Sequence, residues 1–252
     1  MPPIQGPKLG PRLGTVWITR TPEGAKRTAR SVEALGFETL VVPVLKVRAL
    51  RPLIDPHSFD AIIVTSRNGL NAYCELCSRR SITVWCVGDA TAEAARAKKF
   101  QTVLSAEGDV NALLALVLAK ADTSTRLLYI APKDPAAPLA ETLRDKGFQI
   151  KEAAVYETVP SLTGLAPKDA SRLSHILIHS PKAARAIAPI LMAQKDRLDL
   201  NALEFLCISE AAAQALEDAW NQVIKNNSPH ELVKRISKFP DEASLLMLLA
   251  ET

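Results

Sequence analysis

One pattern of short apolar runs occurs twice along this chain, and the repetition narrows the folds that the chain can adopt. Val16–Arg20 opens a strand, helix and strand unit that passes through Gly36-Phe37. A second unit opens at Leu127–Ala131 and passes through Gly147-Phe148. Two similar α/β units predict two lobes, and small molecules commonly bind where two domains meet. Further downstream, the repeated pairs are Ala61–Leu70 with Ile176–Arg185, and Trp85–Ala95 with Phe205–Ala215.

Apolar runs of strand length alternate with segments of helical periodicity throughout the sequence. Because the runs are continuously apolar, they predict an α/β fold of two lobes, each a parallel sheet flanked by helices on both faces. Pro43 interrupts one run and favours an edge strand or a connection there. The expected strands are Val16–Thr19, Glu38–Val47, Ala61–Thr65, Thr83–Val87, Gln101–Leu104, Leu127–Ala131, Gln149–Thr158, His175–His179, Phe205–Ile208 and Gln222–Lys225, and a last helix is expected over Asp241–Ala250.

Composition excludes several classes of protein. The 252 residues are 48% hydrophobic and 23% charged, as in globular proteins. The longest apolar run, Ala112–Ala119, is too short to span a bilayer. Residues 1–14 are rich in Pro and Gly without the apolar core of a signal peptide, so we expect a flexible extension and a cytoplasmic protein. The net charge of +4 forms no basic block, so we expect neither nucleic acid nor a membrane as partner.

The sequence lacks the usual motifs of cofactor and metal sites. Cys74 and Cys77 form a CELC pair within a helical stretch, and no second pair or nearby His completes a zinc set. We expect both to be ordinary packing cysteines. Since GxGxxG, Walker, HExxH and GxSxG motifs are also absent, we expect no metal and no cofactor.

Small hydroxyl, amide, glycine and charged residues follow the predicted strands. Ligands bind beyond the carboxyl ends of the strands in parallel sheets, and the helix N-termini there offer backbone N–H groups to anions. The same residue types are also ordinary helix N-caps, so both interpretations stay open. The candidate binding residues are Arg20, Thr65, Ser66, Asn68, Gly88, Asp89, Thr91, Ser180, Lys182 and Ser209.

Tyr156 lies in AAVYETV, in the run that corresponds to the Pro43 run of the first repeat. We expect these two runs, about 40–49 and 152–160, to cross between the lobes. A phenol on such a crossing can donate a proton or a hydrogen bond to a leaving oxygen. A tyrosine that only packs in the core or at an interface would give the same pattern.

With these motifs in this order, the chain resembles the uroporphyrinogen-III synthase family over residues 15–252. The matching pieces are VWITRTPEGAKRTARSVEALGFETLVVPVL, FDAIIVTSRNGLNAY, CVGDATAEAA, AETLRDKGFQIKEAAVYETV and ILIHSPKAARAI. The resemblance implies a monomeric, cofactor-free carbon–oxygen lyase of heme and other tetrapyrrole biosynthesis. Such an enzyme converts hydroxymethylbilane, a linear tetrapyrrole with eight carboxylates, into uroporphyrinogen III. The reaction loses water and inverts ring D through a spiro intermediate.

The resemblance also suggests roles for residues. Tyr156 matches the family tyrosine proposed to assist loss of the terminal hydroxyl, and Ser180 matches a serine of the second-lobe turn. It implies interleaved lobes, with residues 1–42 and 157–252 in one lobe and 43–156 in the other, joined by a two-stranded linker. Two segments depart from the family pattern, Ser209–Ala213 and Pro132–Pro138. These two departing segments motivate the alternative of a non-catalytic two-lobed protein that binds a small molecule.

The resemblance also covers other candidate residues. The residues that match turns lining the cleft in the family are Thr65, Ser66, Asn68, Gly88 and Thr91.

Overall fold

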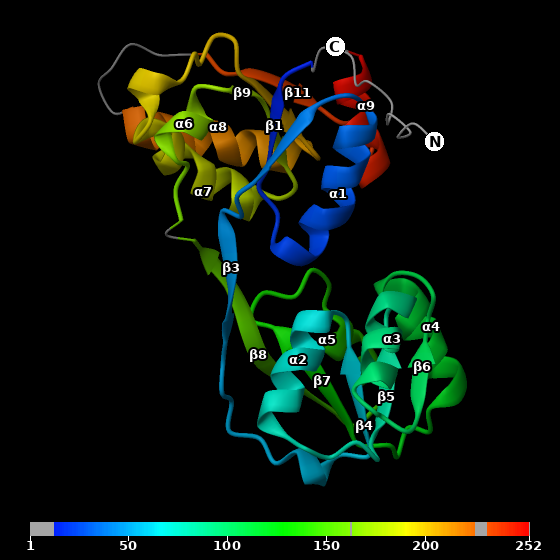
Figure 1. Ribbon diagram of the computed structural model, residues 1–252. Coiled ribbons are helices and arrows are strands. Elements are labelled where there is room, and N and C mark those ends of the chain that lie inside the picture. Colours follow the sequence, from blue (N-terminus) through cyan, green and yellow to red (C-terminus); the bar gives the residue numbers. More distant parts are fainter. Residues whose placement is uncertain (1–12, 162, 225–230, 252) are drawn as a thin grey trace, which may run out of the picture. The chain divides into compact units, whose positions relative to one another are not determined.

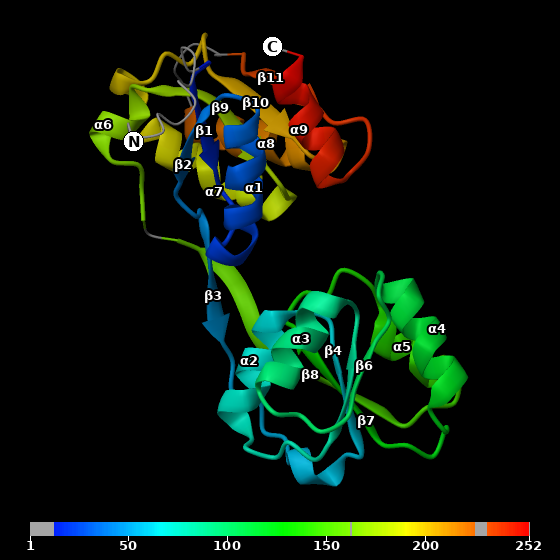
Figure 2. The ribbon, with the colours of Figure 1, turned by 45° about the vertical axis from the view of Figure 1, so that its right-hand side comes forward.

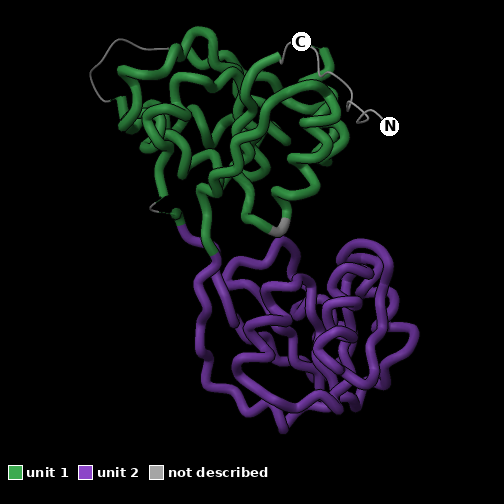
Figure 3. The backbone as a smooth tube through the Cα atoms, in the orientation of Figure 1, with its two compact units in different colours: residues 1–46, 160–252 green, residues 47–159 purple. Residues whose placement is uncertain are grey.

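The computed structural model describes residues 13–161, 163–224 and 231–251, and it divides into two compact units (Figure 3). One unit contains the described residues up to Lys46 and from Pro160 onwards, and the other is Val47–Val159. The chain therefore passes between the units at 46/47 and 159/160, where the sequence suggested 42/43 and 156/157. Most of the flexible extension expected over residues 1–14 lies outside the described residues.

The first unit contains a five-stranded sheet in the order β11-β10-β9-β1-β2, and all four neighbouring pairs run parallel (Figure 1). Its strands are β1 (Thr15–Ile18), β2 (Glu38–Val41), β9 (Leu173–Ile178), β10 (Glu204–Cys207) and β11 (Val233–Ile236). Its helices are α1 (Pro22–Ala34), α6 (Pro167–Ala170), α7 (Pro181–Met192), α8 (Glu210–Ile224) and α9 (Glu242–Ala250), with a 3₁₀ turn at Lys195–Arg197.

Alternate residues of these strands belong to two different cores. Trp17, Ile176 and Phe205 pack with α7 and α8, whereas Leu177 and Leu206 pack with α1 and α9 on the opposite face. Figure 2 shows α1 and α9 side by side on their face of the sheet. The period of two along each strand therefore produces helices on both faces, and the fold class predicted for this unit is confirmed.

The second unit contains a six-stranded sheet in the order β3-β8-β7-β4-β5-β6, in which β8, β7, β4, β5 and β6 run parallel. Ile62 and Leu128 pack with α2 and α3, while Ile63 and Tyr129 pack with α4 and α5. The strands are β3 (Leu45–Ala49), β4 (Ala61–Val64), β5 (Thr83–Cys86), β6 (Val103–Ser105), β7 (Leu127–Pro132) and β8 (Ile150–Pro160). The helices are α2 (Arg67–Leu76), α3 (Asp89–Ala97), α4 (Val110–Lys120) and α5 (Leu139–Asp145), with a 3₁₀ turn at Pro56–Ser58.

Pro43 separates two edge strands. β2 ends at Val41, β3 begins at Leu45, and each is the last strand of its sheet. A proline has no N–H to donate to a neighbouring strand, so the break falls where the chain leaves one sheet for the other. The prediction of an edge or connection at this position is confirmed. β3 and β8 are hydrogen-bonded neighbours, and both carry the chain between the units.

The strand predicted over Gln222–Lys225 is wrong. α8 continues to Ile224, and Val223 and Ile224 pack against the same core as Trp220. These apolar residues extend the helical stripe, which a short window of sequence does not distinguish from a strand. The last strand of the sheet is β11, which was not predicted from the sequence.

The cysteine pair takes the helical position that the sequence predicts. Cys74 lies in α2, and Cys77 caps the helix and is buried in the core beside it, as expected for packing cysteines. Within the described part of the chain, every helix is too short or too polar to cross a bilayer.

The N-terminus of α9 is held by a partly buried polar cluster. Arg20 Nη1 and Thr28 Oγ1 donate to the two carboxylate oxygens of Glu242, and His179 Nε2 lies 3.4 Å from Glu242 Oε2. Burial raises the pKa of the Glu242 carboxyl, but His179, Thr28 and the charge of Arg20 outweigh it and bring the pKa to about 2. A Cβ at Gly24 would lie 2.6 Å from Arg20 Nε, so this glycine leaves room for the guanidinium.

The C-terminus of the same helix is held by a different strand. Arg235 Nη1 donates to the Leu248 carbonyl at 2.9 Å, and Arg235 Nη2 donates to Glu251 at 2.7 Å. A cation near the last turn also interacts favourably with the helix dipole. Both ends of α9 are therefore anchored to the sheet by charged hydrogen bonds.

We expect Leu128→Ala to lower the free energy of unfolding of the second unit by about 2–5 kcal/mol, because it leaves a cavity in the core under α2 and α3. Leu128 is fully buried in β7, whereas Leu53 in the same unit is fully exposed. Urea unfolding measures the change, and Leu53→Ala is the matched control with an expected change within about 0.5 kcal/mol. Equal losses in both variants would contradict the assigned core.

We expect Glu242→Gln to lower the free energy of unfolding at neutral pH by about 2 kcal/mol. The carboxyl is a stronger acid in the folded chain, at a pKa of about 2, than at its ordinary value of 4.5. Its contribution to stability is therefore complete at a pH above the ordinary pKa of 4.5, and it disappears as the pH falls through the folded-state pKa of about 2.

The measurement is urea unfolding of both proteins over a series of acidic pH values, where the difference between them should shrink towards zero. Glu251→Gln, at the other end of α9, is the control, because an exposed ion pair contributes little. A difference between wild type and Glu242→Gln that stays constant through the acid range would contradict the account.

Candidate functional site

Four strands of the second unit bring polar residues to one edge of the sheet. β4, β5, β7 and β8 run parallel, so their carboxyl ends lie on the same side. Thr65 and Ser66 follow β4, Gly88 follows β5, and Tyr156 in β8 stands opposite Pro132 at the end of β7. Ligands of parallel α/β sheets bind at this edge.

Ser66 joins the predicted tyrosine to the start of α2. Ser66 Oγ lies 2.8 Å from the Tyr156 hydroxyl and accepts a hydrogen bond from Gly69 N at 3.1 Å, as the N-cap of the helix. Tyr156 is only 7% exposed. Because the N-terminus of a helix carries partial positive charge, it favours the anion that a phenol becomes after giving up its proton. The sequence named both residues but not their contact.

Gly69 allows α2 to approach the sheet closely at this point. A Cβ on Gly69 would lie 3.1 Å from the Ile130 carbonyl oxygen of β7. That separation is tighter than ordinary van der Waals contact, so the absent side chain determines how near Ser66 lies to the strands. The glycine therefore helps to set the distance between the N-cap and Tyr156.

A β-bulge determines which face of the sheet Tyr156 occupies. Ala131 stands opposite Ala154, but Pro132 stands opposite Tyr156, so Val155 is an extra residue in β8. With strict alternation, Val155 and Tyr156 would face opposite sides. Both instead pack with Ala153 in the core beneath α2 and α3. The bulge turns the phenol towards Ser66, which is how bulges commonly re-aim side chains near sites.

The other candidates of this unit line the first turns of α2 and α3. Thr65 Oγ1 lies 3.5 Å from the hydroxyl of Tyr129, whose pKa is raised by burial although the hydrogen bond to Thr65 lowers it. Asn68 is half-buried in the first turn of α2. At the start of α3, Gly88 is the N-cap, Asp89 is exposed and Thr91 is buried. The structure thus gathers these predicted residues at the carboxyl edge of one sheet.

The candidates of the first unit lie at the corresponding edge of the five-stranded sheet. Ser180 caps α7 by accepting from Ala183 N at 3.1 Å, and Ser209 Oγ accepts from Ala212 N at 3.3 Å. Lys182 is the second residue of α7 and is half-buried. Arg20 follows β1 and pairs with Glu242, so its charge is already balanced within the unit.

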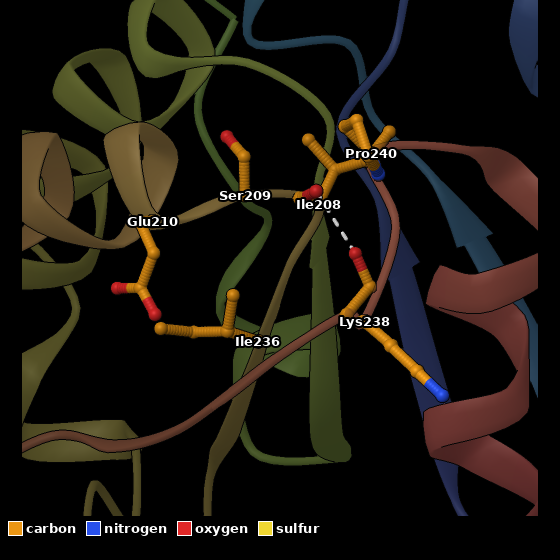
Figure 4. Close-up of a pocket in the computed structure, with 7 residues that line it drawn as sticks. Ile208, Ser209, Glu210, Ile236, Lys238 and Pro240 are labelled. Atoms are coloured by element: carbon orange, nitrogen blue, oxygen red, sulfur yellow. Dashed lines mark hydrogen bonds between the residues drawn. The ribbon is translucent and has the colours of Figure 1, made fainter.

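An open pocket of about 450 Å³ lies at the ends of β10 and β11, where Ser209 contributes to its wall (Figure 4). Ser237, which also lines the pocket, donates from Oγ to the Ile208 carbonyl at 2.9 Å. Ser237 and Lys238 were not among the predicted site residues, because β11, which precedes them, was not predicted from the sequence. The lining residues are Ile208, Ser209, Glu210, Ile236, Ser237, Lys238 and Pro240.

The chain shares its fold with solved structures. It resembles a crystal structure of uroporphyrinogen-III synthetase from Helicobacter pylori 26695 with a TM-score of 0.57 and 17% identity, over 94% of this chain and 98% of the other. A mutant uroporphyrinogen III synthase from the extremely thermophilic bacterium Thermus thermophilus aligns with a TM-score of 0.45 and 15% identity, over 94% and 98% of the two chains. The likeness to the Helicobacter structure shows a common fold.

Sequence comparison gives the family. None of the curated proteins matches this chain. The family model described as uroporphyrinogen-III synthase HemD matches residues 26–230, which is most of the sequence. The chain therefore belongs to the uroporphyrinogen-III synthase family.

Proposed function

We propose that Tyr156 supplies the proton with which this member of the uroporphyrinogen-III synthase family begins to convert hydroxymethylbilane into uroporphyrinogen III. The observation that carries the proposal is the 2.8 Å hydrogen bond between the Tyr156 hydroxyl and Ser66 at the N-terminus of α2. It holds the phenol in one position and supplies a polar partner for either protonation state.

In the proposed step, the phenol proton moves to the oxygen of the terminal hydroxymethyl group. The carbon–oxygen bond then breaks, water leaves with the bonding pair, and the pyrrole nitrogen lone pair stabilises the cation left on carbon. The phenolate remains beside Ser66 and the positive end of α2. Closure of the ring through a spiro intermediate releases a proton that restores the phenol. The reaction is that of a carbon–oxygen lyase.

The carboxyl edges of both sheets are suited to bind the eight carboxylates of the substrate. Helix N-termini bind carboxylates through backbone N–H groups, and each unit presents such termini where its strands end. We propose these turns as substrate contacts, so that much of the catalysis consists of holding the flexible bilane in one pose. The proposed contacts are Thr65, Ser66, Asn68, Gly88, Asp89, Thr91, Ser180, Lys182 and Ser209. A substrate contact by Arg20 stays a prediction.

We propose that the protein acts as a monomer in the cytoplasm without a cofactor, and that the two compact units are the interleaved lobes expected from the sequence. The absence of cofactor motifs from the sequence supports the part of the proposal that concerns the cofactor, and the division into two discontinuous units supports the part that concerns the lobes.

We expect purified protein to convert fresh hydroxymethylbilane mainly into type III product, whereas spontaneous closure gives type I. Tyr156→Phe should reduce the rate about a hundredfold, as loss of a general acid does. Chromatography of the isomers measures both. The control is Tyr73→Phe, because Tyr73 is fully buried in the core beneath α2 and α3 and takes no part in the proposed step. Type I alone from wild type would favour the non-catalytic alternative, and full activity of Tyr156→Phe would remove the role of the phenol.

We expect Ser66→Ala to reduce turnover about tenfold by releasing the Tyr156 hydroxyl, and to destabilise the unit by about 1 kcal/mol by removing an N-cap. Asp109→Ala is the matched control, because Asp109 caps α4 in the same unit through Asn111 N and Ala112 N at 2.9 Å. It should cost similar stability without the loss of turnover. Equal turnover in both variants would assign Ser66 to capping alone.

A further inference from the structure

The residue after Tyr156 is a carboxylate held between two cations. Arg48 donates from Nε at 2.8 Å and from Nη2 to Oε1 of Glu157, and Lys133 Nζ lies 3.3 Å from Oε2. Arg48 comes from β3, Lys133 follows β7, and Glu157 lies in β8. The three charged groups thus join three neighbouring strands of the sheet at the site.

This cluster presents positive charge outwards. The Glu157 side chain is 9% exposed, while those of Arg48 and Lys133 are 61% and 58% exposed. Two cations share one carboxylate, so one positive charge is left over. The hydrogen bonds of Arg48 hold the pKa of the Glu157 carboxyl below its ordinary value despite burial, and Lys133 adds to the effect. The carboxylate therefore remains charged and keeps both cations in place.

The cations retain hydrogen-bonding capacity. A guanidinium has five N–H donors and an ammonium has three, and Glu157 uses two of the former and one of the latter. Among the described residues, neither Arg48 nor Lys133 has a second carboxylate partner. An anion bound here would meet donors that are already oriented, and forked donors suit carboxylates in particular.

The cluster is tied to the catalytic strand. Lys133 N donates to the Tyr156 carbonyl at 2.8 Å, immediately beyond the bulge that aims the phenol at Ser66. Successive residues of a strand face opposite sides, so Tyr156 and Glu157 point away from each other. A molecule lying across the end of β7 reaches the cations while its reacting group lies on the side of Tyr156.

We infer that Arg48 and Lys133, held in position by Glu157, bind a carboxylate of the substrate at the end of β7, next to the strand that carries Tyr156; the inference rests on the proposed function. The substrate carries a carboxylate on each side chain of its pyrrole rings, and anchoring one of them at the end of β7 would fix a ring of the substrate relative to that strand. Glu157 is a positioning residue here, because it acts through the two cations.

The test replaces the cations by neutral side chains of similar size. We expect Lys133→Gln and Arg48→Gln each to raise KM for hydroxymethylbilane about threefold, and the double variant about tenfold, with kcat within about twofold. The dependence of KM on ionic strength should weaken in the double variant, which a purely structural role would not cause. The matched control is Lys151→Gln, an exposed lysine near the opposite end of β8, which should leave KM unchanged.

Two further measurements separate the possible outcomes. Binding of uroporphyrin III, the oxidised product with eight carboxylates, is followed by fluorescence, and its Kd should rise with KM in the double variant. Glu157→Gln should also raise KM although it adds net positive charge, because the cations lose their anchor. A lower KM in that variant would overturn the positioning role.

Unchanged KM and Kd in the double variant would overturn the carboxylate site while leaving the proposed function intact. If wild type forms no type III product, the proposed function fails instead, and the uroporphyrin Kd of the double variant still decides whether the carboxylate site exists. Circular dichroism and urea unfolding check that each variant is folded.

Discussion

Parallel pairing of the strands is the constraint on which the rest of this structure depends. In each unit a strand must be followed by a helix before the next parallel strand can form, so the connections at the carboxyl ends collect on one edge. If the strands did not run parallel, the polar residues that follow them would lie at both edges of the sheet. Helices on both faces also explain why inner strands such as β4 and β5 are almost entirely apolar, whereas the edge strands β3 and β11 carry charged residues.

In the second unit, one extra residue in β8 determines which side chains the strand presents at this edge. Val155 bulges out of β8 and places Tyr156 on the side of Ser66, while Glu157 returns to the other side. The strand thus offers a phenol to one face and a buried carboxylate to the other within two positions. Gly69 contributes by allowing the N-terminus of α2 to approach β7. The pairing of Tyr156 with Ser66 therefore depends on backbone geometry more than on the two residue types.

Much of this could be predicted from the sequence, because the relevant signals are local. Apolar strands, helix periodicity and Pro43 indicated the two sheets and the break between β2 and β3, and the turns after the strands indicated where Ser66 and Gly88 lie. Tyr156 was identified from its place in the repeat and from the family resemblance. The strand expected at 222–225 failed because a short apolar segment suits a helix end as well as a strand.

Nothing in the sequence indicated the interactions between residues that are far apart along the chain. Arg20 meets Glu242, and Arg48 meets Glu157, only once the sheets have formed. No periodicity or spacing encodes such pairs, and the bulge at Val155 has no signal such as glycine to mark it. Arg20 accordingly looked like a cation available to substrate, whereas in the folded unit its charge is balanced by Glu242.

The central claim is that the Tyr156 phenol gives its proton to the leaving hydroxyl. The solvent deuterium isotope effect on single-turnover conversion of hydroxymethylbilane tests it most directly, because it isolates the proton step from product release. The account predicts a normal isotope effect in wild type that disappears in a variant without the phenol, where loss of water proceeds without this donor. An isotope effect of the same size in both proteins would contradict it.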